Sequence, residues 1–234
     1  MLDIHTHILP GVDDGSRSVE QSIKMLQAET AQGVDTVALT PHFYAEKESP
    51  ESFIRRRNTA FRGMLRELRD IENVPDLMLG AEVFYFDGMS RFEDIETLCI
   101  GDTKVLLIEM PFSKWNQRII GEVKELRELR GVRPVLAHVE RYKPFHKPGL
   151  LEELSDCGIR LQINASHILN WQTSMQAMAM IKRNGVDFIA SDCHGLQHRP
   201  PELGAAIEKT EKKLGRQALE FLQRSEEWLL GGME

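Results

Sequence analysis

Residues 2–32 read LDIHTHILPGVDDGSRSVEQSIKMLQAETAQ. Leu2 to Ile8 form a short apolar run of the kind found in buried strands, and the segment from Ser18 to Gln32 has helical period, with apolar residues on one face. Ser18 and Gln21 make a capping box at the start of that segment, and Gly33 is placed to terminate it. The stretch therefore predicts a strand followed by an amphipathic covering helix.

The same order of a short apolar run and a longer helical segment recurs along the chain. The runs expected to form strands are Leu2 to Ile8, Val34 to Thr40, Asp76 to Phe86, Lys104 to Pro111, Arg133 to Val139, Gly158 to Ala165 and Val186 to Asp192. Further helices are expected over Ser52 to Ile71, Trp115 to Leu129, Gly149 to Cys157, Ser174 to Asn184, Pro201 to Leu214 and Arg216 to Leu230. Because the runs are apolar on both faces and no linker divides them, we expect a single α/β domain over residues 1–234, with parallel strands in a barrel or a doubly wound sheet.

The composition is that of a folded protein. The chain has 234 residues, 41% of them hydrophobic and 28% charged, which is enough to bury a core. Its 29 Lys and Arg against 36 Asp and Glu give a net charge of −7, so nucleic-acid binding is not expected. No apolar run reaches the length of a membrane span, the first residues do not resemble a secretion signal, and the three cysteines are too sparse for a disulfide scaffold. These features predict a cytoplasmic protein without membrane insertion, and they leave its oligomeric state open.

Polar side chains lie at or just beyond the ends of the seven apolar runs. In parallel α/β folds the loops after the strands converge on one face, so side chains far apart in the sequence meet there. We therefore expect these residues to form one cluster. The candidates are His5, His7, Asp13, Asp14, His42, Glu82, Glu109, His138, Asp192 and His194.

This set of histidines and carboxylates predicts a metal site. Each motif alone is a weak signal, but charged residues are almost never buried unless they are paired or bind a metal. Imidazole and carboxylate ligands without paired thiolates suit manganese, iron or zinc in an open catalytic site. The ligands are too many for one ion, and a multi-metal cluster that activates water promotes displacement at phosphorus. Arg141 and Arg199 would lie beside such a cluster and could bind phosphate oxygens, so the set indicates phosphate-ester hydrolysis.

The order of these residues resembles the polymerase and histidinol phosphatase (PHP) superfamily, whose fold is a distorted (β/α)7 TIM-like barrel with a trinuclear metal site. More narrowly, the chain resembles the CpsB/CapC-type bacterial protein-tyrosine phosphatases of capsule and exopolysaccharide loci. The motifs that carry this resemblance are DIHTHILPGVDDG, TPHF, GAEV, IEMP, HVERY, QINAS and SDCHGLQHRPP. The chain departs from the family pattern at Val139 and Met110, neither of which supplies a ligand.

The resemblance implies three metal ions. It implies a first ion held by His5, His7, Glu82 and Asp192, a second held by Glu82, Glu109 and His138, and a third held by Asp14, His42 and His194. Asp14 is preferred to Asp13 from its place in the motif, although spacing does not separate them. Manganese is the expected metal, with iron, zinc, cobalt or magnesium as alternatives. The implied substrate is phosphotyrosine on a cognate bacterial tyrosine kinase, with Arg141 and Arg199 as phosphate-binding, catalytic residues.

Aromatic side chains near the strand ends are expected to line the mouth of the site. We expect Phe43 first, and Phe112 second, to contact the tyrosine ring of the substrate. No general acid is assigned, because a phenolate, with a conjugate acid of pKa about 10, leaves without strong protonation.

Three other functions fit parts of the sequence. Cys193 and Arg199 have the C-x5-R spacing of cysteine-dependent tyrosine phosphatases, but Cys193 lies between two expected ligands and should point away from them. A small-molecule phosphatase of the PHP superfamily, such as a histidinol-phosphate phosphatase, is the nearest alternative. A non-catalytic metal-binding or kinase-docking protein is a further one.

Overall fold

The first strand and helix form where the sequence predicts them. In the computed structural model, which describes residues 1–183 and 185–231, β1 spans Leu2–Thr6 and α1 spans Val19–Ala31. The backbone N–H of Gln21 donates a hydrogen bond to the Ser18 side chain, and Gly33 beyond the helix has a φ of 84°. The capping residue and the glycine therefore set the two ends of this helix.

The other predicted strands and helices also form, with shifts of a few residues at their ends. The strands are β2 (Thr36–Leu39), β3 (His42–Phe43), β4 (Asp76–Leu79), β5 (Glu82–Phe84), β6 (Val105–Glu109), β7 (Arg133–Leu136), β8 (Arg160–Asn164) and β9 (Phe188–Ala190). The helices are α2 (Pro50–Leu68), α3 (Gln117–Arg130), α4 (Leu150–Asp156), α5 (Ala165–Leu169), α6 (Ser174–Lys182), α7 (Leu203–Leu214) and α8 (Arg216–Leu230), with short 3-10 turns that include η3 (Val139–Arg141) and η4 (Lys143–Phe145). The α5 helix has no counterpart in the sequence prediction, and Asn184, the expected end of α6, lies outside the described residues.

Two of the seven predicted strands are each broken into two pieces. The third run gives β4 and β5, separated by Gly80 and Ala81. The second run gives β2, and the strand resumes after Thr40 and Pro41, beyond the predicted end of the run, as β3. Pro41 has no amide hydrogen to continue the ladder. A Cβ atom on Gly80 would lie 2.9 Å from the Ile100 side chain, which is too close for an ordinary contact. Any larger residue at this position would therefore require a neighbouring group to move. The breaks divide the strands into a sheet of order β1-β2-β4 and a sheet of order β3-β5-β6-β7-β8-β9, all paired in parallel.

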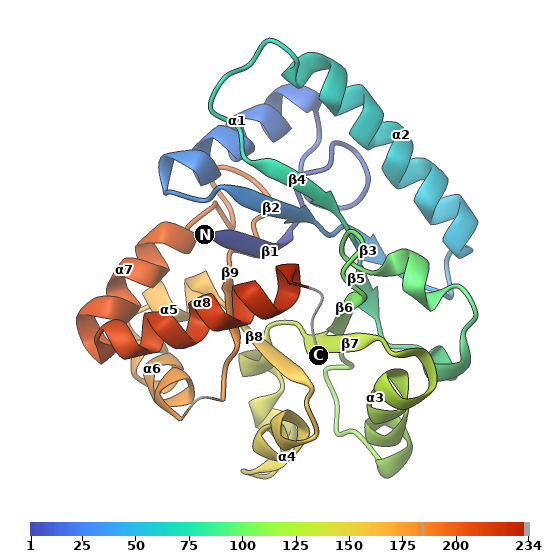
Figure 1. Ribbon diagram of the computed structural model, residues 1–234, viewed down its shortest axis with the longest axis vertical. Coiled ribbons are helices and arrows are strands. Elements are labelled where there is room, and N and C mark those ends of the chain that lie inside the picture. The colour runs from blue at the N-terminus through green and yellow to red at the C-terminus, as the bar shows by residue number, and fades with distance from the viewer. Residues whose placement is uncertain (184, 232–234) are drawn as a thin grey trace.

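The two sheets join into a closed barrel. The two broken strands pair with each other along both of their pieces, β2 with β4 and β3 with β5. At the opposite seam, the backbone N–H of Asp192 donates to the carbonyl of His5 and that of His7 donates to the carbonyl of Cys193, both at 2.9 Å. The helices surround the strands in Figure 1. The predicted distorted (β/α)7 barrel is therefore confirmed, with its distortion at the broken strands.

The interior of the barrel is an apolar core. Alternate residues of non-neighbouring strands, such as Ile4 of β1 and Leu107 of β6, belong to one buried cluster that also includes Leu229 of α8. Arg133 at the start of β7 donates to the carbonyl of Trp228, so α8 covers the amino-terminal end of the barrel, as Figure 1 shows. No helix in the described ranges combines the length and the apolar composition needed to cross a membrane. The opposite end, where the strands finish, is left for the polar residues.

Candidate metal centre

All nine predicted ligands lie together at the carboxyl ends of the strands. They come from β1, β3, β5 and β6 and from the loops that follow β1, β7 and β9. Three groups among them have potential ligand atoms that all lie within 4.8 Å of one another. The groups are His7, Asp14, His42 and His194; His5, His7 and Asp192; and His42, Glu82 and Glu109. Seven of the nine predicted ligands are buried, Asp14 is exposed and His42 is intermediate.

The residues expected at the first ion have the spacing of a shared ligand shell. His5 Nε2 and His7 Nε2 lie 3.2 Å apart, and each lies 3.3 Å from Glu82 Oε2 and 3.4 Å from Asp192 Oδ1. Four ligands at about 2.1 Å from one ion in a tetrahedron are about 3.4 Å apart. The donor atoms therefore fit a divalent cation at their centre.

The other two expected ligand sets are also close, with two differences in grouping. His138 Nε2 lies 2.9 Å from Glu82 Oε1 and 3.5 Å from Glu109 Oε1. His42 Nε2 and His194 Nε2 each lie 3.5 Å from Asp14 Oδ1. The geometry places His7 near the third set as well as the first, and His42 near the second as well as the third.

Three donor atoms in this cluster are buried and make no hydrogen bond of ordinary geometry among the described residues, although His42 Nδ1 and Glu82 Oε2 lie 2.8 Å apart. They are Glu82 Oε2, Asp192 Oδ1 and His42 Nδ1. An unpaired polar atom in the interior is costly unless something else compensates it. The atoms without partners belong to expected ligands, so the residues present fit a metal.

The acidic groups of the cluster are charged to different degrees. Burial opposes ionisation of Glu82 and Asp192, but the nearby His5 and other histidines outweigh it, so the pKa values of both carboxyls lie well below their usual range. Burial and the charge of Glu82 raise the pKa of Glu109 to about 7. Glu82 and Asp192 are therefore ionised and available as ligands at neutral pH.

Four of the histidines have a hydrogen-bond partner at Nδ1, an acceptor oxygen in three cases and the Tyr142 hydroxyl in the fourth, so that Nε2 faces the cluster. The pairs are His5 with Gln162 Oε1 at 3.1 Å, His7 with Asp13 Oδ2 at 2.7 Å, His138 with Tyr142 Oη at 3.2 Å and His194 with the Asp192 carbonyl at 2.9 Å. Such partners fix the tautomer and the ring plane of a metal-binding histidine. The pairing also separates Asp13, which orients His7, from Asp14, which faces His42 and His194.

Two residues of the QINAS motif connect the ligands and were missed in the sequence analysis as functional residues. Gln162 Oε1 also accepts from the backbone N–H of His138 at 2.9 Å, and its Nε2 donates to Asn164 Oδ1 at 2.9 Å. Asn164 then donates to Asp192 Oδ2 at 2.7 Å. The available signal was two polar residues that alternate with Leu161 and Ile163 in a buried strand.

Asp192 joins the cluster to both predicted arginines. Its Oδ1 faces His5 and His7, whereas its Oδ2 accepts from Arg141 Nη2 at 2.9 Å and from Arg199 Nη2. Arg199 Nη1 also lies 2.9 Å from His194 Nε2. The two guanidinium groups, from different loops, therefore meet within the width of one phosphate group. Their side chains are 36% and 40% exposed, so a substrate can reach them.

The backbone is strained at three of these residues. Among the described residues, only five other than glycine have a positive φ, and they include His138 at 34°, Asp192 at 52° and Arg199 at 54°. Each such conformation costs on the order of 1–3 kcal/mol. Strain concentrated at expected ligand and phosphate-binding positions is typical of a functional site.

Two expectations about nearby side chains have different outcomes. The prediction that Phe43 contacts the substrate is wrong, because its ring is fully buried in the core against Phe53, with centroids 5.2 Å apart. Phe112, the second choice, is 46% exposed, and its ring stacks on His138 with centroids 6.0 Å apart.

Cys193 does point away from the cluster, since its buried thiol contacts Glu29 and its pKa is raised well above the usual value by burial.

A cavity of about 680 Å³ borders the cluster on one side. Asp14, His194 and Arg199 line it, together with residues of α1 and of the loop after β9. Two of the expected ligands and one of the two expected phosphate-binding arginines are therefore open to a bulky substrate from this side.

The fold and the site together define a β/α-barrel protein with a candidate multi-metal centre at the carboxyl ends of its strands. Comparison with known proteins gives the family. Residues 1–227 match the family described as capsular polysaccharide synthesis, CpsB/CapC. The tyrosine-protein phosphatase CpsB of Streptococcus pneumoniae is 32% identical over 92% of this chain and 91% of that protein. The tyrosine-protein phosphatase YwqE of Bacillus subtilis is 29% identical over 98% of this chain and 91% of that protein.

A solved structure agrees with these relatives. A crystal structure from work on YwqE of Bacillus subtilis and CpsB of Streptococcus pneumoniae, described as unique metal-dependent tyrosine phosphatases, aligns with a TM-score of 0.87 and 28% identity over 100% of this chain and 96% of that one. The chain belongs to the CpsB/CapC family.

Proposed function

We propose that this protein is a metal-dependent protein-tyrosine phosphatase that holds three manganese ions. The observation that carries the proposal is the Asp192 carboxylate, which faces two histidines with one oxygen and receives two arginines with the other. A phosphate bound by Arg141 and Arg199 would lie directly beside the metal ligands. The names of the CpsB and YwqE relatives support the same reaction.

The proposed ligands are those expected from the sequence: His5, His7, Asp14, His42, Glu82, Glu109, His138, Asp192 and His194. Divalent ions held there supply an activated water and positive charge for the phosphoryl oxygens. Gln162, Asp13 and Tyr142 keep three of the imidazoles in the tautomer that presents Nε2. Arg141 and Arg199 bind and orient the phosphate, and stabilise charge on its oxygens.

We further propose that the substrate is a phosphotyrosine on a bacterial tyrosine kinase of a capsule or exopolysaccharide system. The family description supports the setting, and the exposed Phe112 ring beside His138 suits an aromatic leaving group. Phenolate is a better leaving group than an alkoxide, so hydrolysis of phosphotyrosine depends less on a general acid than hydrolysis of phosphoserine does.

The test compares substrates after metal analysis of the purified protein. We expect bound manganese, rapid hydrolysis of a phosphotyrosine peptide and loss of activity on chelation. Faster turnover of histidinol phosphate than of the peptide would favour the small-molecule alternative. A metal-loaded protein that hydrolyses neither would contradict the proposal and favour a non-catalytic role.

A further inference from the structure

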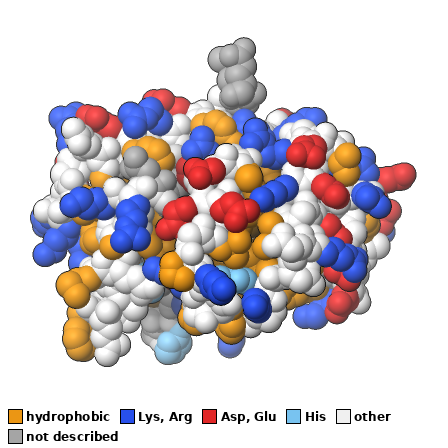
Figure 2. Space-filling view, turned by 90° about the horizontal axis from the view of Figure 1, so that it is seen from below, with side chains coloured by type: hydrophobic (Ala, Val, Ile, Leu, Met, Phe, Trp, Pro, Cys, Tyr) orange, Lys and Arg blue, Asp and Glu red, His pale blue; other side chains and the backbone are white. Residues whose placement is uncertain are grey.

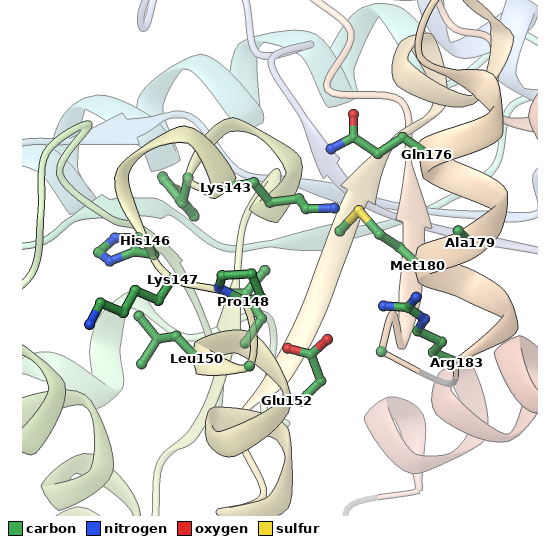
Figure 3. Close-up of a pocket in the computed structure, with 14 residues that line it drawn as sticks. Lys143, His146, Lys147, Pro148, Leu150, Glu152, Gln176, Ala179, Met180 and Arg183 are labelled. Atoms are coloured by element: carbon green, nitrogen blue, oxygen red, sulfur yellow. The ribbon is translucent and has the colours of Figure 1, made fainter.

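A second pocket lies outside the metal centre, between the η4–α4 segment and α6 (Figure 3). Its volume is about 310 Å³, which is in the range of pockets that bind a specific ligand. Part of its lining is apolar, formed by Leu150, Leu151 and Met180. None of the residues predicted from the sequence to act in catalysis lines it.

The polar groups of this pocket favour an anion. Lys143 and Arg183 extend toward the cavity from opposite walls in Figure 3, with the Gln176 amide on the Lys143 side and the Glu152 carboxylate on the Arg183 side. Glu152 is the one carboxylate in the lining, and neither Lys143 nor Arg183 has a carboxylate within ion-pair distance in residues 1–183 and 185–231. Figure 2 shows the face formed by α6, α4 and α3, with basic side chains gathered on its α6 side and acidic ones near its centre. Both side chains are exposed and therefore available to a ligand of opposite charge, on a chain whose net charge is −7.

The pocket shares a wall with the metal centre. Tyr142 lines the pocket, and its hydroxyl lies 3.2 Å from Nδ1 of His138. Arg141, which is expected to bind the phosphate, is the preceding residue. An extended polypeptide spans about 3.3 Å per residue, so residues that flank a phosphotyrosine at the metal centre would pass over the neighbouring surface on which the pocket opens.

Exposed apolar side chains beside the pocket favour a polypeptide over a small anion. Met175 of α6 is 85% exposed and lies one helical turn before Ala179, which lines the pocket, and Trp171 just before α6 is 82% exposed. Exposed apolar groups of this size next to a pocket are typical of surfaces that another chain covers.

We propose that this pocket is an accessory subsite that binds an acidic side chain of the same polypeptide whose phosphotyrosine occupies the metal centre. The carboxylate lies between Lys143 and Arg183, and its methylene groups lie on Leu150, Leu151 and Met180. This inference rests on the proposed phosphatase function and adds a preference for acidic residues near the phosphotyrosine.

The test uses paired fluorescent peptides that carry a non-hydrolysable difluorophosphonate in place of phosphotyrosine. Each pair differs by Glu or Gln at one position, within about five residues on either side, which is the reach given by the chain length per residue. Binding to the manganese-loaded protein is measured by fluorescence anisotropy. At one or more positions the Glu peptide is expected to bind about fivefold more tightly than its Gln partner, the size expected for two partly exposed ion pairs.

The double variant Lys143→Ala/Arg183→Ala should remove this difference and leave binding of the Gln peptide unchanged. Lys182→Ala is the matched control, because Lys182 is an exposed neighbour of Arg183 that does not line the pocket. The difference should also shrink as salt is added, since it is electrostatic. Equal binding of Glu and Gln peptides at every position, or a preference that survives in the double variant or is lost in the control, would overturn the subsite.

Hydrolysis of 4-nitrophenyl phosphate separates this proposal from the one on which it rests. That substrate cannot reach the pocket, so the double variant should hydrolyse it at the wild-type rate. No hydrolysis by the metal-loaded wild type would count against the phosphatase function, while the binding comparison would still decide the subsite.

Discussion

Replacing Gln162 with methionine tests whether the hydrogen-bonded shell around the ligands controls metal binding. Methionine has a similar length and volume but offers no acceptor for the imidazole of His5 or the backbone N–H of His138, which now lie 3.1 and 2.9 Å from Gln162 Oε1. Without that acceptor, His5 can carry its proton on Nε2, the atom that faces Glu82 and Asp192. Loss of such a partner typically lowers metal affinity about 10- to 100-fold.

The same variant should also lower the stability of the fold. An unpaired buried N–H costs about 1–3 kcal/mol. For a chain of this length each kcal/mol lowers Tm by about 2–4 °C, so the expected loss is about 2–12 °C. Manganese affinity is measured by calorimetric titration and Tm by differential scanning fluorimetry without metal.

Two further variants sharpen the comparison. Gln162→Glu keeps an acceptor oxygen and should retain more of the manganese affinity than Gln162→Met. Gln172→Met makes the same chemical change at an exposed position and should bind manganese like the wild type. If Gln162→Met bound manganese as tightly as the wild type, the positioning role of Gln162 would be refuted.

Three other outcomes are expected. Arg141→Ala and Arg199→Ala should each lower kcat/KM for 4-nitrophenyl phosphate about 10- to 150-fold, since each removes a charged hydrogen bond to phosphate, and steady-state kinetics with rates near wild type would contradict that role. Cys193→Ser should retain most of the activity while chelation abolishes it, as measured with the same substrate, and the reverse result would restore the cysteine mechanism. Burial, and then the charge of Asp3, raises the pKa of Glu29 to about 9, so the folded chain holds a proton that the unfolded chain releases above its usual pKa. Stability should therefore fall as pH rises toward 9, and Tm scans of Glu29→Gln should show a weaker decline, whereas parallel curves would be inconsistent with a protonated Glu29.

The sequence was sufficient to predict the alternation of strands and helices because its signals are local, whereas the choice of a barrel over a doubly wound sheet came from the resemblance to the PHP superfamily. A run of a few adjacent residues, such as Leu2 to Ile8, predicts where a strand lies. A single capping residue, such as Ser18, predicts where a helix begins. The breaks at Pro41 and Gly80 were not predicted, since a continuous apolar run does not reveal where a strand changes its pairing partner.

The clustering of the expected ligands could be predicted from the sequence, whereas their surroundings were less predictable. Buried histidines and carboxylates at strand ends seldom serve a purpose other than metal binding, so residue type alone predicts a metal site. The role of Gln162 depends on a neighbour from another strand, His5, which only the closed barrel brings near. The prediction that Phe43 contacts the substrate was wrong because β3 begins at His42. Successive side chains of a strand point to opposite faces, so Phe43, the residue after an expected ligand, faces the core.

The seam between β1 and β9 has a consequence for how the protein acquires its ions. His5 and His7 precede Asp192 by more than 180 residues in the sequence, and the backbone bonds that join them form only when β9 docks beside β1. If Asp192 is a ligand as we propose, the shell of the first ion cannot be completed before β9 joins β1. An ion held by His5, His7 and Asp192 would then cross-link the two strands that close the barrel wall.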